Sequence, residues 1–231
     1  MPLQPNNHVQ IKQKVLIIHN YYQIPGGEDT VVANEKKLLE DNGHEVILYT
    51  RSNNEIKTMG IFKKLLLPFI TIYNPRSSAD IKKIIRTEKI NIVHVHNTLN
   101  LISPSVWYAA VRSGVPVVQT VHNFRFICPN GILYRDGHVC EDCLKKGLAC
   151  AVKHGCYRNS RMQTLILTIS ALIHRATGIY GKINFICLTE FNKEKLLLIN
   201  SKKEIIDPAR VFVKPNFTFS DNSEPANITS E

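Results

Sequence analysis

The sequence lacks the features that mark membrane-spanning and secreted proteins. Its most apolar stretches, 65–73 and 165–173, fall well short of the roughly 20 residues that cross a bilayer. Residues 1–13 are polar and contain no apolar core of a signal peptide. We therefore expect a cytoplasmic protein. In that reducing compartment the six cysteines are not expected to form a disulfide framework.

The motifs of nucleotide-dependent oxidoreductases and epimerases are also missing. Neither GxGxxG nor Tyr-x-x-x-Lys occurs, which argues against both classes. Acidic residues are scarce: 19 Asp and Glu stand against 29 Lys and Arg, a formal charge of +10. This excess favours anionic partners such as nucleotide diphosphates, lipid phosphates or an acidic membrane surface. Aromatic residues are not interleaved with basic ones, so no nucleic acid partner is expected.

What the sequence does have is a regular alternation of strand and helix patterns. Short apolar runs predict strands at 14–19, 45–50, 91–96, 115–121, 184–188 and 211–213. Helical patterns lie between them, at 29–42, from Ser78 to about 88, from Ser103-Pro104 to Gly114, at 161–176 and after Thr189. The alternation predicts an α/β fold with a doubly wound, mainly parallel sheet over residues 14–219. A disordered arm (1–13) and tail (220–231) are expected to flank it.

Residues 124–159 interrupt this alternation and are predicted to be a Cys-rich insertion. They hold five of the six cysteines, including the pair in Cys140-Glu-Asp-Cys143. Four thiolates in such a segment suit a structural, tetrahedral zinc ion. The preferred ligands are Cys128, Cys140, Cys143 and Cys156; Cys150, His138 and His154 are substitutes. Free thiols packed in a small subdomain and a redox-active CxxC pair are the alternatives.

A glycine pair, Gly26-Gly27, lies in the loop after the first strand. Glycines let backbone N–H groups approach a phosphate at a helix N-terminus. The alternative is a tight turn that needs glycine only for a positive φ.

Histidines stand at the ends of three predicted strands, where ligands bind in open α/β sheets. These are His19, His96 and His122. His122 is the strongest candidate, because Asn123 follows it and the Cys-rich insertion begins just beyond. We predict that His96 and Asn123 contact the substrate beside it. His94 alternates with apolar residues and is interpreted as structural.

The segment 61–73 is apolar with Lys63 and Lys64 near one end. It is interpreted mainly as a helix packed on the sheet, kinked or broken at Pro68. The alternative is a basic amphipathic helix at a membrane surface.

Several pieces of the chain, taken in order, resemble the N-terminal domain of family 4 glycosyltransferases. They are KVLIIHNYYQIPGGEDTVV, LEDNGHEVILYT, INIVHVHNTLNLISPSVWYAAVRSGVPVVQTVHNFRFICPNG, LTEFNKEKLLL and VFVKPNF, and the CPNG, CEDC and CYRNS segments resemble a subset of the family. The resemblance implies one Rossmann-like half of a GT-B fold and retaining transfer of a sugar from an NDP-sugar. It implies a saccharide or lipid-linked acceptor, as in surface polysaccharide synthesis.

The resemblance also implies roles for individual residues. His122 matches the histidine near the transferred sugar and is the predicted catalytic residue. Gly26 and Gly27 would lie beside the sugar-nucleotide diphosphate and the acceptor, and Glu28 and Asn97 would shape the acceptor side. Transfer itself is expected to need no cofactor, and a structural zinc ion would be separate from it.

One part of the family pattern has no counterpart. The donor nucleotide is held mainly by a C-terminal half with paired glutamates in an EX7E motif, and only fourteen residues follow Phe217 here. We therefore expect the chain to act with a C-terminal glycosyltransferase domain, in cis or in trans, and to be inactive without it. Peripheral contact with the inner face of the membrane would fit a lipid-linked acceptor. The alternative function is a non-catalytic, zinc-stapled binding module derived from a truncated glycosyltransferase.

Overall fold

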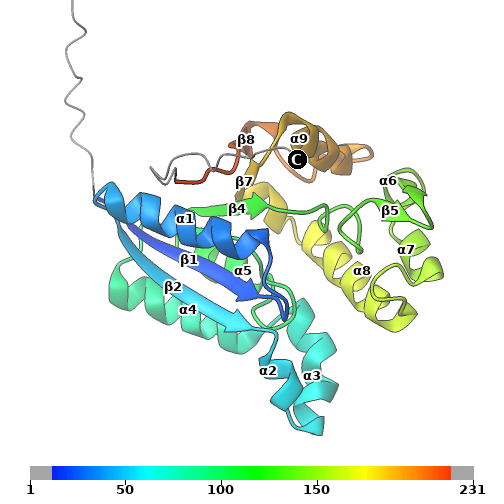
Figure 1. Cartoon of the computed structure of the whole chain (residues 1–231), viewed down its shortest axis with the longest axis horizontal. Helices are drawn as coiled ribbons and strands as arrows, with labels where there is room; N and C mark the ends of the chain where they lie inside the picture. The colour runs from blue at the N-terminus through cyan, green and yellow to red at the C-terminus, as the bar shows by residue number, and fades with distance from the viewer. Residues whose placement is uncertain (1–11, 220–231) are drawn as a thin grey trace, which may run out of the picture.

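Six parallel strands form the central sheet of the computed structural model, which describes residues 12–219 (Figure 1). The strands are β1 (Lys14–Tyr21), β2 (Glu45–Ser52), β3 (Ile92–Val95), β4 (Val117–Val121), β7 (Asn184–Cys187) and β8 (Val211–Val213). All six strand predictions and the parallel, doubly wound α/β class are confirmed. The arm and tail predicted at 1–13 and 220–231 lie outside the described residues, apart from positions 12 and 13.

The order of the strands places a ligand-binding edge near the centre of the sheet. The order is β2-β1-β3-β4-β7-β8, so the direction of winding reverses between β1 and β3. In doubly wound sheets ligands bind at this switch point, beyond the carboxyl ends of the strands. His19 at the end of β1 and His96 just after β3 flank it.

The two faces of the sheet are covered by different helices (Figure 1). On one face Val15 and Ile17 pack with Val32 of α1 (Gly27–Asp41). On the other face Leu16 and Ile18 pack with α4 (Pro75–Glu88) and α5 (Ser105–Arg112). Because alternate side chains of a strand point to opposite faces, one apolar run in β1 serves both layers.

Two helix starts differ from the prediction. Ser78 does not cap α4; instead the side chain of Asn74 accepts hydrogen bonds from the N–H groups of Arg76 and Ser77. Pro104, not Ser103, occupies the N-cap position of α5, although Ser103 Oγ accepts a bond from the Ser105 N–H. The α8 helix (Arg161–Ala176) agrees with its predicted range, and Thr189 caps α9 (Glu190–Leu197) as predicted.

The insertion lies beside the sheet and shares its hydrophobic core through Ile127, Cys128 and Leu133. Its elements are short: β5 (Tyr134–Arg135), β6 (His138–Val139), α6 (Asp142–Lys145) and α7 (Ala149–His154). The α7 helix packs against α8, which carries the chain back to the sheet. Three 3₁₀ turns complete the described chain: η1 (Ile179–Lys182), η2 (Leu198–Asn200) and η3 (Pro208–Arg210).

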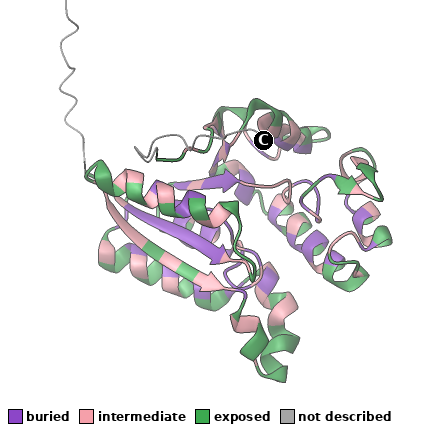
Figure 2. Cartoon of the chain, in the orientation of Figure 1, coloured by how far each residue is buried: buried purple, intermediate pink, exposed green. Residues whose placement is uncertain are grey.

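The apolar segment 61–73 does form a helix, but the prediction that it packs on the sheet is wrong. A short helix, α2 (Glu55–Thr58), leads into α3 (Ile61–Ile72), which contains Pro68 without ending there. The α3 helix packs against α8 and leaves Phe62 80% and Phe69 69% exposed. Figure 2 colours most of this helix as exposed or intermediate. Apolar composition predicted burial here, but Thr71 is the one buried residue of this helix.

No helix among residues 12–219 is both long enough and apolar enough to cross a membrane.

Candidate functional site

A cavity of about 100 Å³ opens at the carboxyl edge of β3 and β4. His96, His122 and Asn123 line it from the ends of these strands, and Leu167 and Ser170 of α8 line the opposite side. The predicted site residues His96, Asn97, His122 and Asn123 therefore meet at one place. This cavity lies at the carboxyl edge predicted from strand order, next to β3 and β4 and one strand away from the switch point between β1 and β3.

His122 is oriented by its neighbour. Its Nε2 atom lies 3.0 Å from His96 Nδ1, and the two rings are stacked. Burial, together with the nearby His96, lowers the pKa of His122 to about 3. At neutral pH the ring is therefore uncharged, and it can present a hydrogen-bond donor or acceptor but not a fixed positive charge.

Asn97 and His19 have clear scaffold roles. Asn97 donates to the Asn20 carbonyl (2.7 Å) and accepts from the Leu99 N–H (3.0 Å), which fixes the loop after β3. His19 is fully buried, and its Nε2 lies 2.8 Å from Asp29 Oδ1 at the start of α1. His19 does not line the cavity. His19 does lie near the carboxyl end of its strand, as predicted, but its side chain does not reach the cavity that His96 and His122 line.

Glu28 and Asn123 form a second polar group next to the cavity. Asn123 Nδ2 donates to Glu28 Oε1 at 3.2 Å, and its Oδ1 accepts from the Arg125 N–H at 3.1 Å. The other carboxylate oxygen of Glu28 is buried without a hydrogen-bond partner. Burial raises the pKa of Glu28 above its ordinary value. An unused, desolvated acceptor oxygen is suited to a hydroxyl group of a ligand.

The glycine pair is not required by positive φ, although Gly26 occupies the N-cap of α1, where glycine is a favoured residue. Gly26 is extended, with φ −136°, and Gly27 is not among the residues with positive φ. The interpretation as a tight turn that needs a positive φ is therefore wrong. A Cβ atom at either position would meet nothing within 4 Å. Both glycines border open space at the N-terminus of α1, where Asp29 Oδ2 accepts from the Gly26 N–H at 3.1 Å.

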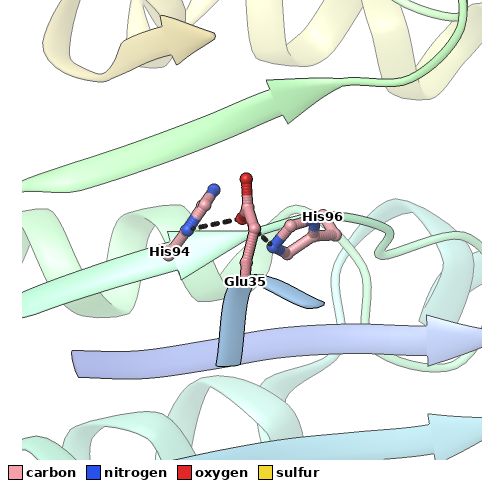
Figure 3. A group of neighbouring side chains, drawn as sticks. All are labelled: Glu35, His94 and His96. Atoms are coloured by element: carbon pink, nitrogen blue, oxygen red, sulfur yellow. Dashed lines mark ion pairs between the residues drawn. The ribbon is translucent and has the colours of Figure 1, made fainter. Parts of the chain in front are cut away.

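Sequence reasoning missed a cluster beneath α1, shown in Figure 3. Glu35 Oε2 lies 3.4 Å from His94 Nδ1 and 3.3 Å from His96 Nε2. The signal was present: Glu35 falls three and four residues after Val32 and Val31, so a carboxylate interrupts the buried stripe of the helix. The interpretation of His94 as purely structural is incomplete, although its Nε2 does bond Thr120 Oγ1 (2.8 Å).

Lys214 joins this cluster from the segment after β8. Its Nζ atom donates to Glu35 Oε1 at 2.7 Å. Burial opposes ionisation of Glu35, but His96, His94 and Lys214 together hold the pKa of its carboxyl below the usual range. The carboxylate is therefore ionised, with one oxygen facing the lysine and the other facing the two imidazoles.

The cysteine cluster is only partly assembled. Cys128 and Cys143 are neighbours: Cys143, together with nearby backbone N–H groups of residues 130, 131 and 133, lowers the pKa of Cys128 below its ordinary value. The same pairing raises the pKa of Cys143. Cys140 and Cys156 lie near Arg135. Among residues 12–219 the thiols do not form a group of three within 4.8 Å, whereas Glu35, His94 and His96 do.

The donor set of the insertion nevertheless fits zinc. Backbone N–H groups near Cys128 lower the pKa of its thiol and so favour the thiolate form that zinc binds. Zinc at the four predicted cysteines stays a prediction.

Comparison with known proteins agrees with the motifs. The model of "Glycosyltransferase Family 4" matches residues 25–147, more than half of the chain. A Klebsiella pneumoniae protein described as an "uncharacterized 42.6 kDa protein in cps region" is 32% identical over 108 residues, which are 45% of this chain and 29% of that protein. The chain thus spans less than a third of the length of this curated relative.

Two solved structures are more distantly similar. The UDP co-structure of S. aureus MnaA has 14% identity and a TM-score of 0.47, with 88% of this chain and 45% of that chain covered. MurG of Acinetobacter baumannii has 12% identity and a TM-score of 0.35, with coverage of 90% and 69%. Neither likeness is close enough to carry an argument. The family match, which includes the glycine pair, His96 and His122, does: the chain belongs to glycosyltransferase family 4.

Proposed function

We propose that this chain is the acceptor-side domain of a retaining glycosyltransferase. It would move a sugar from an NDP-sugar to a saccharide or lipid-linked acceptor, as in the synthesis of surface polysaccharides. In this proposal His122 faces the transferred sugar, Gly26 and Gly27 give the substrates close access to the backbone, and Glu28 and Asn123 hold an acceptor hydroxyl. His96 positions His122, and Asn97 holds the loop beside it.

The observation that carries the proposal is the glycine pair. Neither glycine is required by its φ or by contact with the rest of the chain. In this proposal the two glycines leave space in which a substrate can come close to the backbone. The free oxygen of Glu28 lies on the next residue. Carboxylates at 28 and 29 begin α1, and because they repel anions this end of the helix suits acceptor hydroxyls better than a diphosphate.

The size of the cavity supports a second domain in the working enzyme. About 100 Å³ is small beside the 300–1,000 Å³ of common ligand pockets. A site completed by a donor-binding domain, in cis or in trans, would supply the remaining volume and the contacts to the nucleotide. Catalysis would then rest on positioning and on electrostatic stabilisation of the leaving diphosphate.

The exposed apolar face of α3 supports peripheral membrane contact, which a lipid-linked acceptor would require. Phe62, Leu65 and Phe69 are exposed, and Lys63 and Lys64 lie in the same helix. Apolar side chains that enter the headgroup region, flanked by lysines, are typical of interfacial helices.

A transfer assay tests the proposal. The chain is mixed with UDP-glucose, UDP-galactose or UDP-N-acetylglucosamine and octyl glycoside acceptors, alone and with a separately expressed donor-binding domain of a family 4 enzyme. We expect transfer only in the mixture, and a loss of about 10²–10³-fold in His122→Ala, the cost of removing one transition-state contact. His138→Ala, an exposed histidine of the insertion, is the matched control.

Two results would contradict the proposal. Transfer by the chain alone would show that it needs no donor-binding partner. Full activity of His122→Ala in the mixture would remove this histidine from the catalytic site. Saturation-transfer NMR with the octyl glycosides separates binding from catalysis, and glycoside binding with no transfer in any mixture would favour a non-catalytic module.

A further inference from the structure

We propose that Glu35, His94 and His96 form a binding site for a divalent transition-metal ion, with Zn²⁺ as the reference ion. The site lies between the sheet and α1, one side chain away from His122. It is distinct in position and in ligand chemistry from the cysteine cluster. It does not rest on the proposed transfer activity.

The distances fit a shared ion better than hydrogen bonds. Glu35 Oε2 is 3.4 Å from His94 Nδ1 and 3.3 Å from His96 Nε2, and all three atoms lie within 4.8 Å of one another. Two ligand atoms on a tetrahedral zinc ion with bonds of about 2.0–2.1 Å are separated by about 3.3–3.4 Å. Hydrogen bonds between such groups are shorter, near 2.7–3.2 Å.

The facing atoms also lack other partners. Glu35 Oε2 and His96 Nε2 are both buried without a hydrogen bond. A buried polar atom without a partner costs about 1–3 kcal/mol, so two of them at one point call for an explanation. One cation between them would satisfy both, and an ionised carboxylate supplies part of the compensating charge.

The outer nitrogen of each imidazole is already held as metal sites require. Metal-bound histidines almost always bond through the second ring nitrogen, which fixes the ring and its tautomer. Here His94 Nε2 lies 2.8 Å from Thr120 Oγ1, and His96 Nδ1 lies 3.0 Å from His122 Nε2. Metal on His96 Nε2 would require a proton on Nδ1, which would then donate to His122 Nε2.

This tautomer has a consequence for the cavity. If His122 Nε2 accepts, the proton of the neutral His122 ring must be on Nδ1. The ion would thus select one of the two neutral forms of His122 without touching it. Two imidazoles and one carboxylate favour zinc, nickel, copper or cobalt over magnesium or calcium, which prefer oxygen ligands.

Lys214 is the competing cation. It donates to Glu35 Oε1 while its side chain is 43% exposed, so it can move into solvent when an ion binds. The two oxygens of one carboxylate are divided between the lysine and the histidines. Because the lysine and the ion repel each other across Glu35, removing the lysine charge should tighten metal binding.

Metal binding by matched variants tests the site. The full chain is dialysed against chelator, loaded with Zn²⁺ or Co²⁺, dialysed again and analysed by mass spectrometry of the metal. We expect wild type to retain one equivalent more than Glu35→Gln, which keeps the side-chain size. Glu40→Gln, an exposed carboxylate of the same helix, should match wild type.

Cobalt spectra distinguish metal bound at this site from metal bound by the cysteines. Ions held by imidazole and carboxylate give visible d–d absorption, whereas thiolate ligands add a charge-transfer band in the near ultraviolet. The absorption lost in Glu35→Gln should be of the first kind only. Cobalt affinity should fall at least about 100-fold in Glu35→Gln, because losing a residue that only positions a metal ligand already costs up to about 100-fold. In Lys214→Met the cobalt affinity should rise.

The outcomes decide the proposal. Equal metal content and equal spectra in wild type and Glu35→Gln would overturn it, as would lost absorption that carries the charge-transfer band. Circular dichroism checks that Glu35→Gln is folded. If it is not, Lys214→Met decides, because tighter cobalt binding supports the site and unchanged or weaker binding overturns it.

Discussion

The sheet and the insertion both gather side chains of the types that can bind a metal, but the secondary structure that carries these side chains differs between the two regions. Glu35, His94 and His96 are all buried and project from an α-helix and a strand end whose positions are set by the apolar core. The cysteines of residues 124–159 project from turns, two-residue strands and helices of four and six residues. The sheet cluster therefore needs no ligand to be assembled, whereas the insertion has little regular secondary structure and relies on Ile127, Cys128 and Leu133 to join it to the main core.

The difference follows from the residues that surround each cluster. Leu16, Ile17, Val93 and Val95 are fully buried in β1 and β3, the strands next to the sheet cluster, and such burial supplies most of the folding free energy. The insertion buries only a few apolar side chains, among them Ile127, Leu133 and Leu148. A segment that adds so few side chains to the main core and has so little regular structure is suited to further stabilisation by a metal or another cross-link.

The largest effect should come from removing the cysteine pair of the insertion. In Cys128→Ser with Cys143→Ser we expect the insertion to lose its order while the sheet stays folded, because zinc binding and folding are coupled in such segments. Limited proteolysis with trypsin should then cut at Lys145, Lys146 and Lys153, and a chelator should expose the same bonds in wild type.

Cys150→Ser is the matched control, since Cys150 lies in the same insertion outside the preferred ligand set. It should resist trypsin like wild type. If the wild-type insertion still resists trypsin in the presence of chelator, packing alone orders it. The insertion and the sheet would then not differ in their need for a metal.

The next largest effect should come from Phe185, which joins the two regions. Its ring is fully buried in β7 and meets Phe126, at the start of the insertion, with ring centroids 5.4 Å apart. Phe185→Ala should lower the free energy of unfolding by about 3–5 kcal/mol, measured by urea denaturation. Phe212 on β8 is 54% exposed, so Phe212→Ala should change the free energy of unfolding much less. Equal losses in the two variants would show that the Phe185–Phe126 contact does not hold the two regions together.

The smallest effect on stability should come from α3. Phe62→Ser with Phe69→Ser should leave the free energy of unfolding within about 0.5 kcal/mol per site, as for other exposed positions. Binding to vesicles of phosphatidylglycerol, measured by co-sedimentation, should nevertheless fall sharply. Vesicles of phosphatidylcholine serve as the uncharged comparison. Unchanged sedimentation with the acidic lipid would remove the membrane role from this helix.

The sequence predicted the sheet well because its signals are local. Each strand is a short apolar run, and turn and cap residues such as Gly43 and Thr189 mark the ends of helices. The meeting of His96, His122 and Asn123 followed from one topological rule about strand ends. These features need only the pattern along the chain and the parallel order of the strands.

The remaining features depend on distances through space. Glu35 is 59 positions from His94 in the chain, so nothing local links the two. The exposure of α3 could not be predicted either, because it depends on how much of the helix its partner α8 covers. Gly26 and Gly27 were found by residue type, but the choice between turn and ligand needed their φ values and the empty space beside them.

The segment after β8 is tied to α1 at several points. Lys214 donates to Glu35, Asn34 Nδ2 donates to the Phe217 carbonyl at 3.1 Å, and Lys37 Nζ lies 4.9 Å from the Phe219 ring centre. The segment that follows β8 is thus linked through Lys214 to the buried carboxylate of Glu35. Displacement of this segment would withdraw the positive charge of Lys214 from Glu35 and so change the electrostatic potential at a carboxylate that His96 alone separates from His122.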